Sequence, residues 1–251
     1  MPQYDYIYLG DNARNPYGTR SFEVVYEYTR QAVFYLFGQG CRLVILACNT
    51  ASAKALRNIQ QIDLPVSYPD RRVLGVIRPS VEMVPQLTRT NHVGVLGTKG
   101  TVLSESYPLE IAKMPSEQPI SVVQEACPMW VPIVENNVME SPGAAFFIEQ
   151  NINSLFAKDQ LIDTIILGCT HYPLLSNVIR QFLPGGVTLL DQGPLVADKL
   201  EDYLFRHPEI ETNCSKSGRR DYLTTESPAN FDHLANLFLE SDVASRQIRL
   251  G

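Results

Sequence analysis

The chain has 251 residues, of which 45% are hydrophobic and 19% charged, so it can bury a core and is not a disordered chain. Its 21 lysines and arginines stand against 27 aspartates and glutamates, and a net charge of −6 argues against a nucleic-acid-binding protein, whose basic surface neutralises phosphates. There is no apolar stretch near the roughly 18 residues that cross a membrane, and five cysteines without CxxC spacing argue against a disulfide framework or a metal site. We therefore expect a cytoplasmic protein without nucleic-acid or membrane partners.

Short apolar runs alternate with amphipathic helices through the first third of the chain. The expected strands cover residues 6–9, 43–47 and 73–77. Ser21 is placed to cap a helix that ends at Gly38 or Gly40. Further helices are expected over residues 51–62 and from Pro79 onwards. This alternation is typical of an α/β fold with a mostly parallel sheet.

The alternation then starts again. The expected strands are 93–98, 121–123, 164–167, 187–190 and 222–224, and the expected helices are 144–156, 174–182, 195–205 and 231–239. The polar residues 209–220 are expected to form a loop. Two cycles of similar size predict two similar α/β domains with mostly parallel sheets.

One design occurs at the end of a predicted strand in both halves. Residues 43–50 (LVILACNT) and 164–171 (TIILGCTH) each run from an apolar strand through one small residue to a cysteine, and two hydrogen-bonding residues then open a helix. Cys48 and Cys169 are therefore expected at the carboxyl ends of parallel strands, where α/β sheets bind ligands. A lone cysteine in such a place is more often a small core residue, but two copies favour a function. Three further cysteines lack the design and are interpreted as structural: Cys41, Cys127 and Cys214.

Two such cysteines would allow inversion of a stereocentre without a cofactor. A helix N-terminus favours the thiolate form of a cysteine, and its free N–H groups bind a carboxylate. A thiolate on one face of a substrate can remove a proton while a thiol on the other face returns one. The residues that follow the cysteines could hold the substrate: Asn49, Thr50, Thr170 and His171. His171 could also serve as an acid or base beside Cys169.

These segments and others give the chain a resemblance to the glutamate racemases of the aspartate/glutamate racemase family. The matching segments follow the family's order over most of the chain: 10–18 (GDNARNPYG), 47–51 (ACNTA), 75–79 (GVIRP), 94–98 (GVLGT), 126–135 (ACPMWVPIVE) and 168–175 (GCTHYPLL). The cysteine pair combined with the Pro-Tyr-Gly and Val-Pro segments makes the resemblance specific. It implies a two-domain α/β enzyme that interconverts L- and D-glutamate for peptidoglycan synthesis. Such an enzyme uses neither pyridoxal phosphate nor any other cofactor.

The resemblance also assigns roles to residues. It implies that Cys48 acts on the α-proton of D-glutamate and Cys169 on that of L-glutamate, with Glu135 and His171 as acidic and basic helpers. The substrate-binding residues that it implies are Pro16, Tyr17, Gly18, Asn49, Thr50, Thr170 and His171. Without the resemblance, Glu135 reads equally well as a solvated carboxylate near a helix start, and Arg14 as the ion-pair partner of Asp11.

The domain organisation that we expect is carried over from the resemblance as well. A discontinuous first domain would comprise residues 1–90 and 189–251, and a second domain residues 91–188, with the active site in the cleft between them. Members of the family are often dimers, so a homodimer is an expectation that no feature of the sequence tests.

The sequence departs from the family pattern at its beginning. The family opens with an apolar strand and an Asp-Ser-Gly turn, whose aspartate assists the first cysteine, and this sequence contains no Asp-Ser-Gly. Residues 191–193 (DQG) follow a predicted strand but match a different family segment. Omission of the strand would expose neighbouring backbone and apolar surface. We therefore expect an N-terminally truncated first domain and strongly reduced racemase activity.

Three other functions stay open. The chain could racemise aspartate or another acidic amino acid, because one methylene is worth only about 1–3 kcal/mol in a pocket. Cys169 and His171 could instead form the nucleophile pair of a hydrolase or amidotransferase, for which Cys48 would be dispensable. The third alternative is a non-catalytic protein that binds glutamate or a macromolecular partner without turnover.

Overall fold

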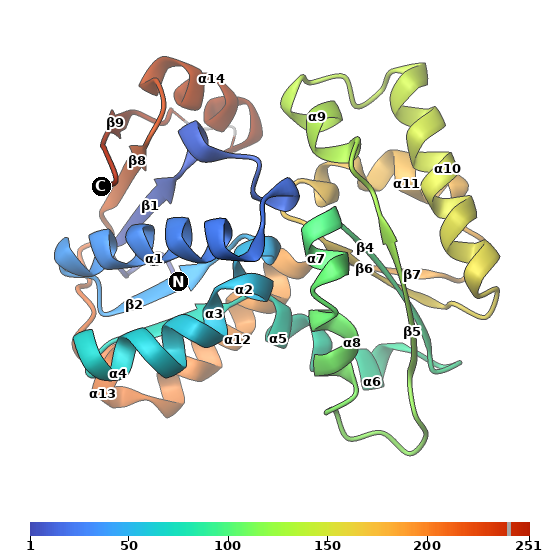
Figure 1. Cartoon of the computed structure of the whole chain (residues 1–251), viewed down its shortest axis with the longest axis horizontal. Helices are drawn as coiled ribbons and strands as arrows, with labels where there is room; N and C mark the ends of the chain where they lie inside the picture. The colour runs from blue at the N-terminus through green and yellow to red at the C-terminus, as the bar shows by residue number, and fades with distance from the viewer. Residues whose placement is uncertain (240–241) are drawn as a thin grey trace. The chain divides into compact units, whose positions relative to one another are not determined.

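The computed structural model describes residues 1–239 and 242–251, which form two compact units (Figure 1). Unit 1 comprises Met1–Leu46, Lys54–Leu74 and Leu200–Gly251, and unit 2 comprises Ala47–Ala53 and Gly75–Lys199. Parallel strands alternate with helices in the chain, which confirms the predicted α/β class. Residues 47–53, 75–90 and 189–199 group with unit 2, whereas the predicted boundaries assign them to the first domain.

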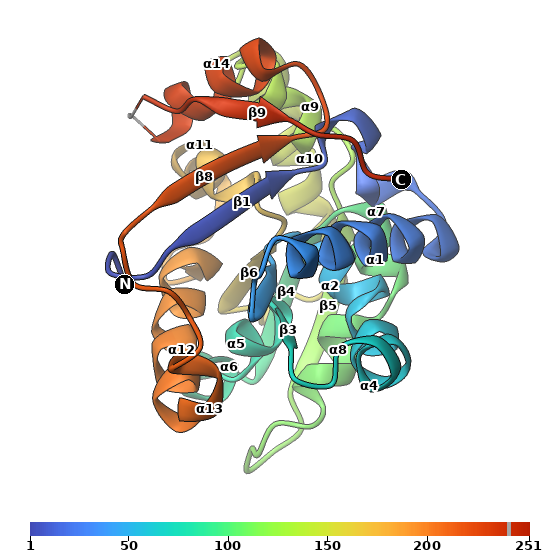
Figure 2. The ribbon, with the colours of Figure 1, turned by 90° about the vertical axis from the view of Figure 1, so that its left-hand side faces the viewer.

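Unit 1 contains two separate sheets. Strands β1 (Tyr6–Gly10), β8 (Arg220–Thr224) and β9 (Ser245–Gln247) form a parallel sheet in the order β1-β8-β9, and they lie side by side in Figure 2. Strands β2 (Leu43–Leu46) and β3 (Arg72–Gly75) form a two-stranded sheet. Among the described residues no strand joins β1 to β2, so each of these two strands has one edge without a strand partner.

The first helix of unit 1 begins where the sequence predicts it, after an N-terminal capping residue. Helix α1 (Phe22–Gly38) begins after Ser21, whose hydroxyl accepts a hydrogen bond from the Val24 N–H at 3.4 Å, as predicted. Its buried face packs on the β2–β3 sheet in a core that also includes Val33, Phe37 and Val44. The remaining helices that lie wholly or partly in this unit are α2 (Asn49–Lys54), α3 (Leu56–Asn58), α4 (Leu64–Ser67), α12 (Gln192–Arg206), α13 (Pro208–Glu211) and α14 (Pro228–Leu239).

Several predicted boundaries in and near unit 1 are wrong. The single helix expected over residues 51–62 is α2 (Asn49–Lys54) followed by α3 and a π-helical turn at Ile59–Asp63, with Ala55 between α2 and α3. The predicted loop over residues 209–220 contains part of α13 and the start of β8. Strand β9 was not predicted, because it is three residues long, mostly exposed and carries no apolar alternation.

Unit 2 is built on a four-stranded parallel sheet. Its order is β5-β4-β6-β7, with β4 (His92–Gly97), β5 (Ser121–Ala126), β6 (Thr164–Gly168) and β7 (Thr188–Leu190). Strand β6 is buried along its whole length, and its last residue, Gly168, lies opposite Gly97 of β4. Each strand of this sheet had been predicted at its position within two or three residues.

The other helices lie wholly in unit 2. They are α5 (Ile77–Val81), α6 (Val84–Leu87), α7 (Lys99–Leu103), α8 (Ser106–Ile111), α9 (Trp130–Glu135), α10 (Pro142–Lys158) and α11 (Ser176–Phe182). The predicted strand over 73–77 ends at Gly75, and α5 begins two residues before Pro79. The helix expected over 174–182 consists of a 3-10 helix, Tyr172–Leu175, and then α11.

One buried carboxylate ties a loop of unit 2 to the sheet. Asp163, just before β6, is 7% exposed and accepts hydrogen bonds from the Thr88 hydroxyl at 2.7 Å and from the N–H groups of Arg89 and Thr90 at 2.6 and 2.9 Å. The Thr164 hydroxyl also donates to it, at 3.0 Å. Burial alone would raise the pKa of Asp163, but these donors outweigh burial and hold the pKa below its usual 3.8.

Replacement of this carboxylate by an amide tests its contribution to stability. Asp163→Asn points an NH₂ group at a cluster of donors, so we expect it to cost about 1–3 kcal/mol at pH 7 and to lower Tm by about 3–10 °C. Because the folded-state pKa lies below the unfolded one, this contribution is present above the unfolded pKa and is lost as the pH falls through the folded value. The Tm difference should therefore shrink below about pH 4. Glu149→Gln, at an exposed carboxylate of α10, is the matched control, and an equal Tm for both variants would contradict the assignment.

Candidate active site

Cys48 lies between the end of β2 and the start of α2, as the sequence predicts. It is partly buried, and its carbonyl accepts the N–H of Ser52, which closes the first turn of α2, at 2.9 Å. Burial raises the pKa of the Cys48 thiol, while hydrogen bonds from the N–H groups of Ala51 and Thr50 and from the Thr50 hydroxyl lower it by less. The thiol is therefore neutral at pH 7.

Cys169 follows β6 and is 7% exposed. Burial raises the pKa of its thiol to about 12, against the lowering effect of hydrogen bonds with the His171 N–H and the Thr170 hydroxyl. The 3-10 helix after it begins only at Tyr172, so Cys169 does not stand at a helix start as the sequence suggested. The local N–H groups favour the thiolate at both cysteines, as predicted, but the loss of hydration on burial outweighs them, so both thiol pKa values are raised.

Both cysteines belong to unit 2 and interact with each other. Cys48 falls in the segment Ala47–Ala53 and Cys169 in the segment Gly75–Lys199. A negative charge on Cys48 raises the pKa of Cys169, which requires the two sulfurs to lie within electrostatic reach. The structure thus brings together in one unit the two strand ends that the repeated sequence design singled out.

A histidine and a glutamate lie beside Cys169. The Nδ1 atom of His171 is 3.9 Å from the Cys169 sulfur, and its Nε2 atom is 3.4 Å from an Oε1 oxygen of Glu135. Both side chains are partly exposed, and Glu135 is the last residue of α9 rather than near its start. The arrangement offers a proton path from the thiol through the imidazole to a carboxylate.

The two residues after Cys48 are held by hydrogen bonds. The Thr50 hydroxyl lies 2.9 Å from the Thr98 hydroxyl and 3.3 Å from that of Thr101. The Oδ1 atom of Asn49 accepts the Tyr107 hydroxyl at 2.7 Å, whereas its Nδ2 atom is buried and has no hydrogen-bond partner among the described residues. A buried unpaired donor next to a thiol is a suitable contact for a substrate carboxylate. Thr170, by contrast, is exposed.

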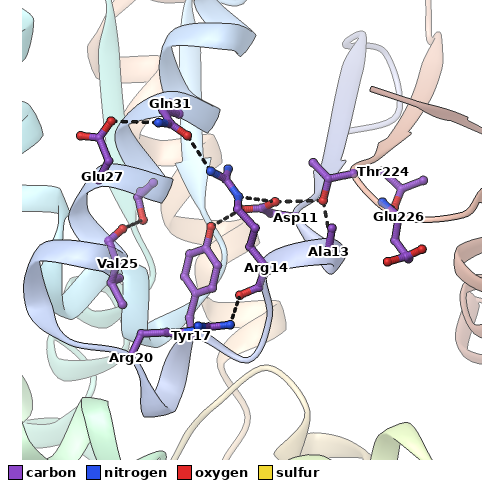
Figure 3. A network of polar contacts seen from close by, with 12 residues as sticks. Asp11, Ala13, Arg14, Tyr17, Arg20, Val25, Glu27, Gln31, Thr224 and Glu226 are labelled. Atoms are coloured by element: carbon purple, nitrogen blue, oxygen red, sulfur yellow. Dashed lines mark hydrogen bonds and ion pairs between the residues drawn. The ribbon is translucent and has the colours of Figure 1, made fainter. Parts of the chain in front are cut away.

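Pro16, Tyr17 and Gly18 lie in unit 1, in the loop between β1 and α1. Figure 3 shows the polar network that holds this loop. Asp11, directly after β1, accepts a hydrogen bond from the Tyr17 hydroxyl. The Arg14 Nε lies 2.9 and 2.8 Å from the two carboxylate oxygens of Asp11, which confirms the predicted pairing of Asp11 with Arg14. The hydroxyl of Thr225, in the loop after β8, donates to the same carboxylate at 2.9 Å. The loop is therefore anchored to a segment more than two hundred residues away.

Further residues around the cysteines were not found from the sequence. The hydroxyls of Thr98 and Thr101 lie within hydrogen-bond distance of Thr50. Tyr107 bonds to Asn49, and Gln192 is linked to Asn49 through Tyr107. Thr98 ends one of the family segments, which was a usable signal. Tyr107 lies in none of these segments, and its contact with Asn49 spans 58 residues.

The described part of the chain lacks a membrane-spanning helix and a cluster of metal-binding side chains. No helix there is long and apolar enough to cross a membrane. In the same residues there is no group of three or more histidine, cysteine, aspartate or glutamate side chains placed to hold a metal ion.

Known proteins resemble this chain in sequence. A family model described as Asp/Glu/Hydantoin racemase matches residues 1–200. A glutamate racemase of Geobacter metallireducens is 37% identical over 239 residues, 95% of this chain and 84% of the relative. A glutamate racemase of Streptococcus agalactiae is 36% identical over 254 residues, which covers 100% of this chain and 90% of the relative.

Solved structures extend the similarity to the fold. Glutamate racemase isoform RacE1 from Bacillus anthracis has a TM-score of 0.88 and 30% identity, over 100% of this chain and 90% of that one. The glutamate racemase of Francisella tularensis in complex with D-glutamate has a TM-score of 0.85 and 29% identity, over 100% and 89%. With a family match over most of its length and relatives that are 36–37% identical over 95–100% of it, this chain belongs to the Asp/Glu/hydantoin racemase family.

Proposed function

We propose that this chain interconverts L- and D-glutamate by a two-thiol mechanism and so supplies D-glutamate for peptidoglycan. The observation that carries the proposal is the pair of strand-end cysteines, Cys48 and Cys169, which both belong to unit 2 and lie within electrostatic reach of each other. The relatives that align over the full chain at about 36% identity are glutamate racemases, which supports glutamate rather than aspartate as the substrate. No step requires a cofactor.

The proton transfers balance once one of the two cysteines is a thiolate and the other a thiol. One cysteine, as thiolate, takes the α-proton of glutamate and becomes a thiol, which leaves a planar carbanion stabilised by the adjacent carboxylate. The other cysteine, as thiol, gives its proton to the opposite face and becomes a thiolate. Cys169 acts on L-glutamate and Cys48 on D-glutamate, and each turnover exchanges their protonation states.

The neighbouring residues supply the charge control that this cycle needs. Because Cys169 rests as a neutral thiol, a base must first remove its proton, and His171 is in place to do so with Glu135 to balance the imidazolium. The donor Nδ2 of Asn49, with Thr50 and Thr170, binds the substrate near the thiols. Pro16, Tyr17 and Gly18 are the further substrate-binding residues in this proposal, and the Asp11 network keeps Tyr17 in place.

The proposal also includes the location of the enzyme in the cell and its oligomeric state. The enzyme works in the cytoplasm, where its five cysteines stay reduced. It forms a homodimer, as members of its family often do. Light scattering on the purified chain measures the second point directly, and a monomeric mass at micromolar concentration would contradict it.

Removal of each thiol tests the mechanism. With the purified chain in D₂O and either glutamate isomer, we expect α-proton exchange together with inversion, measured by NMR and optical rotation. Because both thiols take part in every turnover, Cys48→Ala and Cys169→Ala should each lower racemisation by on the order of 10²–10⁴-fold. Cys214→Ala, at a partly buried cysteine of unit 1, is the control and should retain full activity.

The alternatives give different results in the same assay. A hydrolase or amidotransferase that uses Cys169 and His171 would keep its activity in Cys48→Ala. An aspartate racemase would show a higher kcat/KM for aspartate than for glutamate. Glutamate binding without exchange in the unmodified chain would leave a binding protein, and the proposal would then be wrong.

The raised thiol pKa values make a second prediction, for chemical reactivity. Only the thiolate reacts with iodoacetamide, so alkylation of Cys169 should be slow at pH 7 and rise about tenfold for each pH unit up to pH 9.5, below its pKa of about 12. Peptide mass spectrometry follows the rate at each cysteine, and N-acetylcysteine gives the profile of an unperturbed thiol. A rate at Cys169 that levels off below pH 8 would show a depressed pKa instead.

A further inference from the structure

A chain of buried polar side chains lies behind Asn49 in unit 2. Tyr107 and Ser80 are 0% exposed, Asn49 is 2% exposed and Gln192, the first residue of α12, is 7% exposed. The Nε2 atom of Gln192 donates to the Tyr107 hydroxyl and to the Ser80 hydroxyl, both at 2.7 Å, and the Tyr107 hydroxyl donates to Asn49 Oδ1, also at 2.7 Å. Polar groups this deeply buried are expected to satisfy one another.

The direction of every hydrogen bond in this chain follows from one backbone carbonyl. The Ser80 hydroxyl donates its hydrogen to the carbonyl of Val76 at 3.1 Å, and a carbonyl can only accept. The Ser80 oxygen must therefore accept from Gln192, which turns the amide nitrogen of Gln192, and not its oxygen, toward Ser80 and Tyr107.

The same reasoning passes on to Asn49. Since the Tyr107 oxygen accepts from Gln192, its own hydrogen is free for Asn49, and Asn49 has to present its carbonyl oxygen to receive it. The NH₂ group of Asn49 is thereby turned to the other side, where it is buried and has no partner. Burial raises the pKa of Tyr107, so its hydroxyl keeps the hydrogen that it donates.

The ring of Tyr107 is fixed by the segment that carries the other thiol. A β-carbon added at Gly168, the residue before Cys169, would lie 3.2 Å from Tyr107 Cε2 and 3.0 Å from the Leu96 carbonyl oxygen. The ring therefore packs directly against the end of β6 and cannot move toward it. Both the ring and the hydroxyl of Tyr107 are held in place.

We infer that Gln192 and Tyr107 are positioning residues that fix the amide of Asn49 with its NH₂ group facing the substrate, as a donor to a glutamate carboxylate. The inference rests on the proposed function, since it names how one residue of that site is set for its anionic substrate. Gln192 and Tyr107 touch no substrate themselves and act only through Asn49.

The variant Gln192→Glu reverses the direction of the hydrogen bonds that link residue 192, Tyr107 and Asn49. A carboxylate at this position accepts the Tyr107 hydrogen, so the Tyr107 oxygen must accept from Asn49, and the Asn49 carbonyl then faces the substrate. A carbonyl opposed to a carboxylate weakens ground state and transition state alike, so we expect KM for glutamate to rise about 10–100-fold with kcat changed less than about threefold. Tyr107→Phe removes the hydroxyl that links Gln192 to Asn49 and adds no charge, so it should raise KM by a smaller factor.

A matched control and a direct readout complete the test. Gln86→Glu makes the same charge change at an exposed residue of α6 and should leave KM unchanged. In ¹⁵N NMR spectra without glutamate, the Asn49 side-chain amide signals should shift downfield in Gln192→Glu, where that amide gains a hydrogen bond, and not in Gln86→Glu. Asn49→Asp assigns these signals.

The outcomes separate this inference from the proposed function. Folded Gln192→Glu and Tyr107→Phe variants with unchanged KM, or Asn49 amide signals that do not move in Gln192→Glu, would overturn the positioning role. A downfield shift in a chain that neither exchanges nor inverts glutamate would support the orientation of Asn49 and overturn the racemase function instead.

Discussion

The packing of Tyr107 is the constraint on which the site in unit 2 depends. Its ring lies against Gly168 at the end of β6, and its hydroxyl bonds to Asn49 at the start of α2. The two contacts connect the residue before one thiol with the residue after the other. Because protein interiors are close-packed, neither contact can shift without a cavity or an unpaired hydroxyl. One aromatic side chain therefore fixes both cysteine-bearing segments with respect to each other, and a larger residue than glycine at position 168 would disturb both.

Burial gives the two thiols properties that a helix N-terminus alone would not. It raises their pKa values, so both rest as neutral thiols, which react slowly with oxidants and alkylating agents. The same burial makes the corresponding thiolate a stronger base, which suits the removal of a weakly acidic α-proton. The N–H groups near each sulfur partly offset the loss of hydration. The neutral thiol is therefore the resting form of both cysteines, and the thiolate forms only when a proton is removed.

Local patterns could be predicted from the sequence, and long-range contacts could not. The strand ends that carry Cys48 and Cys169, the Ser21 cap and the pairing of Asp11 with Arg14 all depend on residues a few positions apart. The partners of Asn49 depend on contacts across 58 and 85 residues, for which Tyr107 and Gln192 leave no periodic signal. The net direction of the thiol pKa shifts could not be predicted for a related reason. The N–H groups could be counted from the local sequence, but burial is set by the whole fold.

The two copies of the cysteine design are not chemically equivalent. On the Cys48 side, neutral Asn49 and Thr50 are buried and held by fixed hydrogen bonds, whereas the Cys169 side carries an exposed Thr170 and a titratable His171 next to Glu135. Two thiols with different neighbours differ as bases, so the two directions of a racemisation would have different kcat and KM values. Enantiomers have equal free energies, however, and the ratio of kcat/KM for the two directions must then equal unity. The asymmetry can change how tightly each isomer is held and how fast it reacts, but the isomer with the higher kcat must then have a KM that is higher by the same factor.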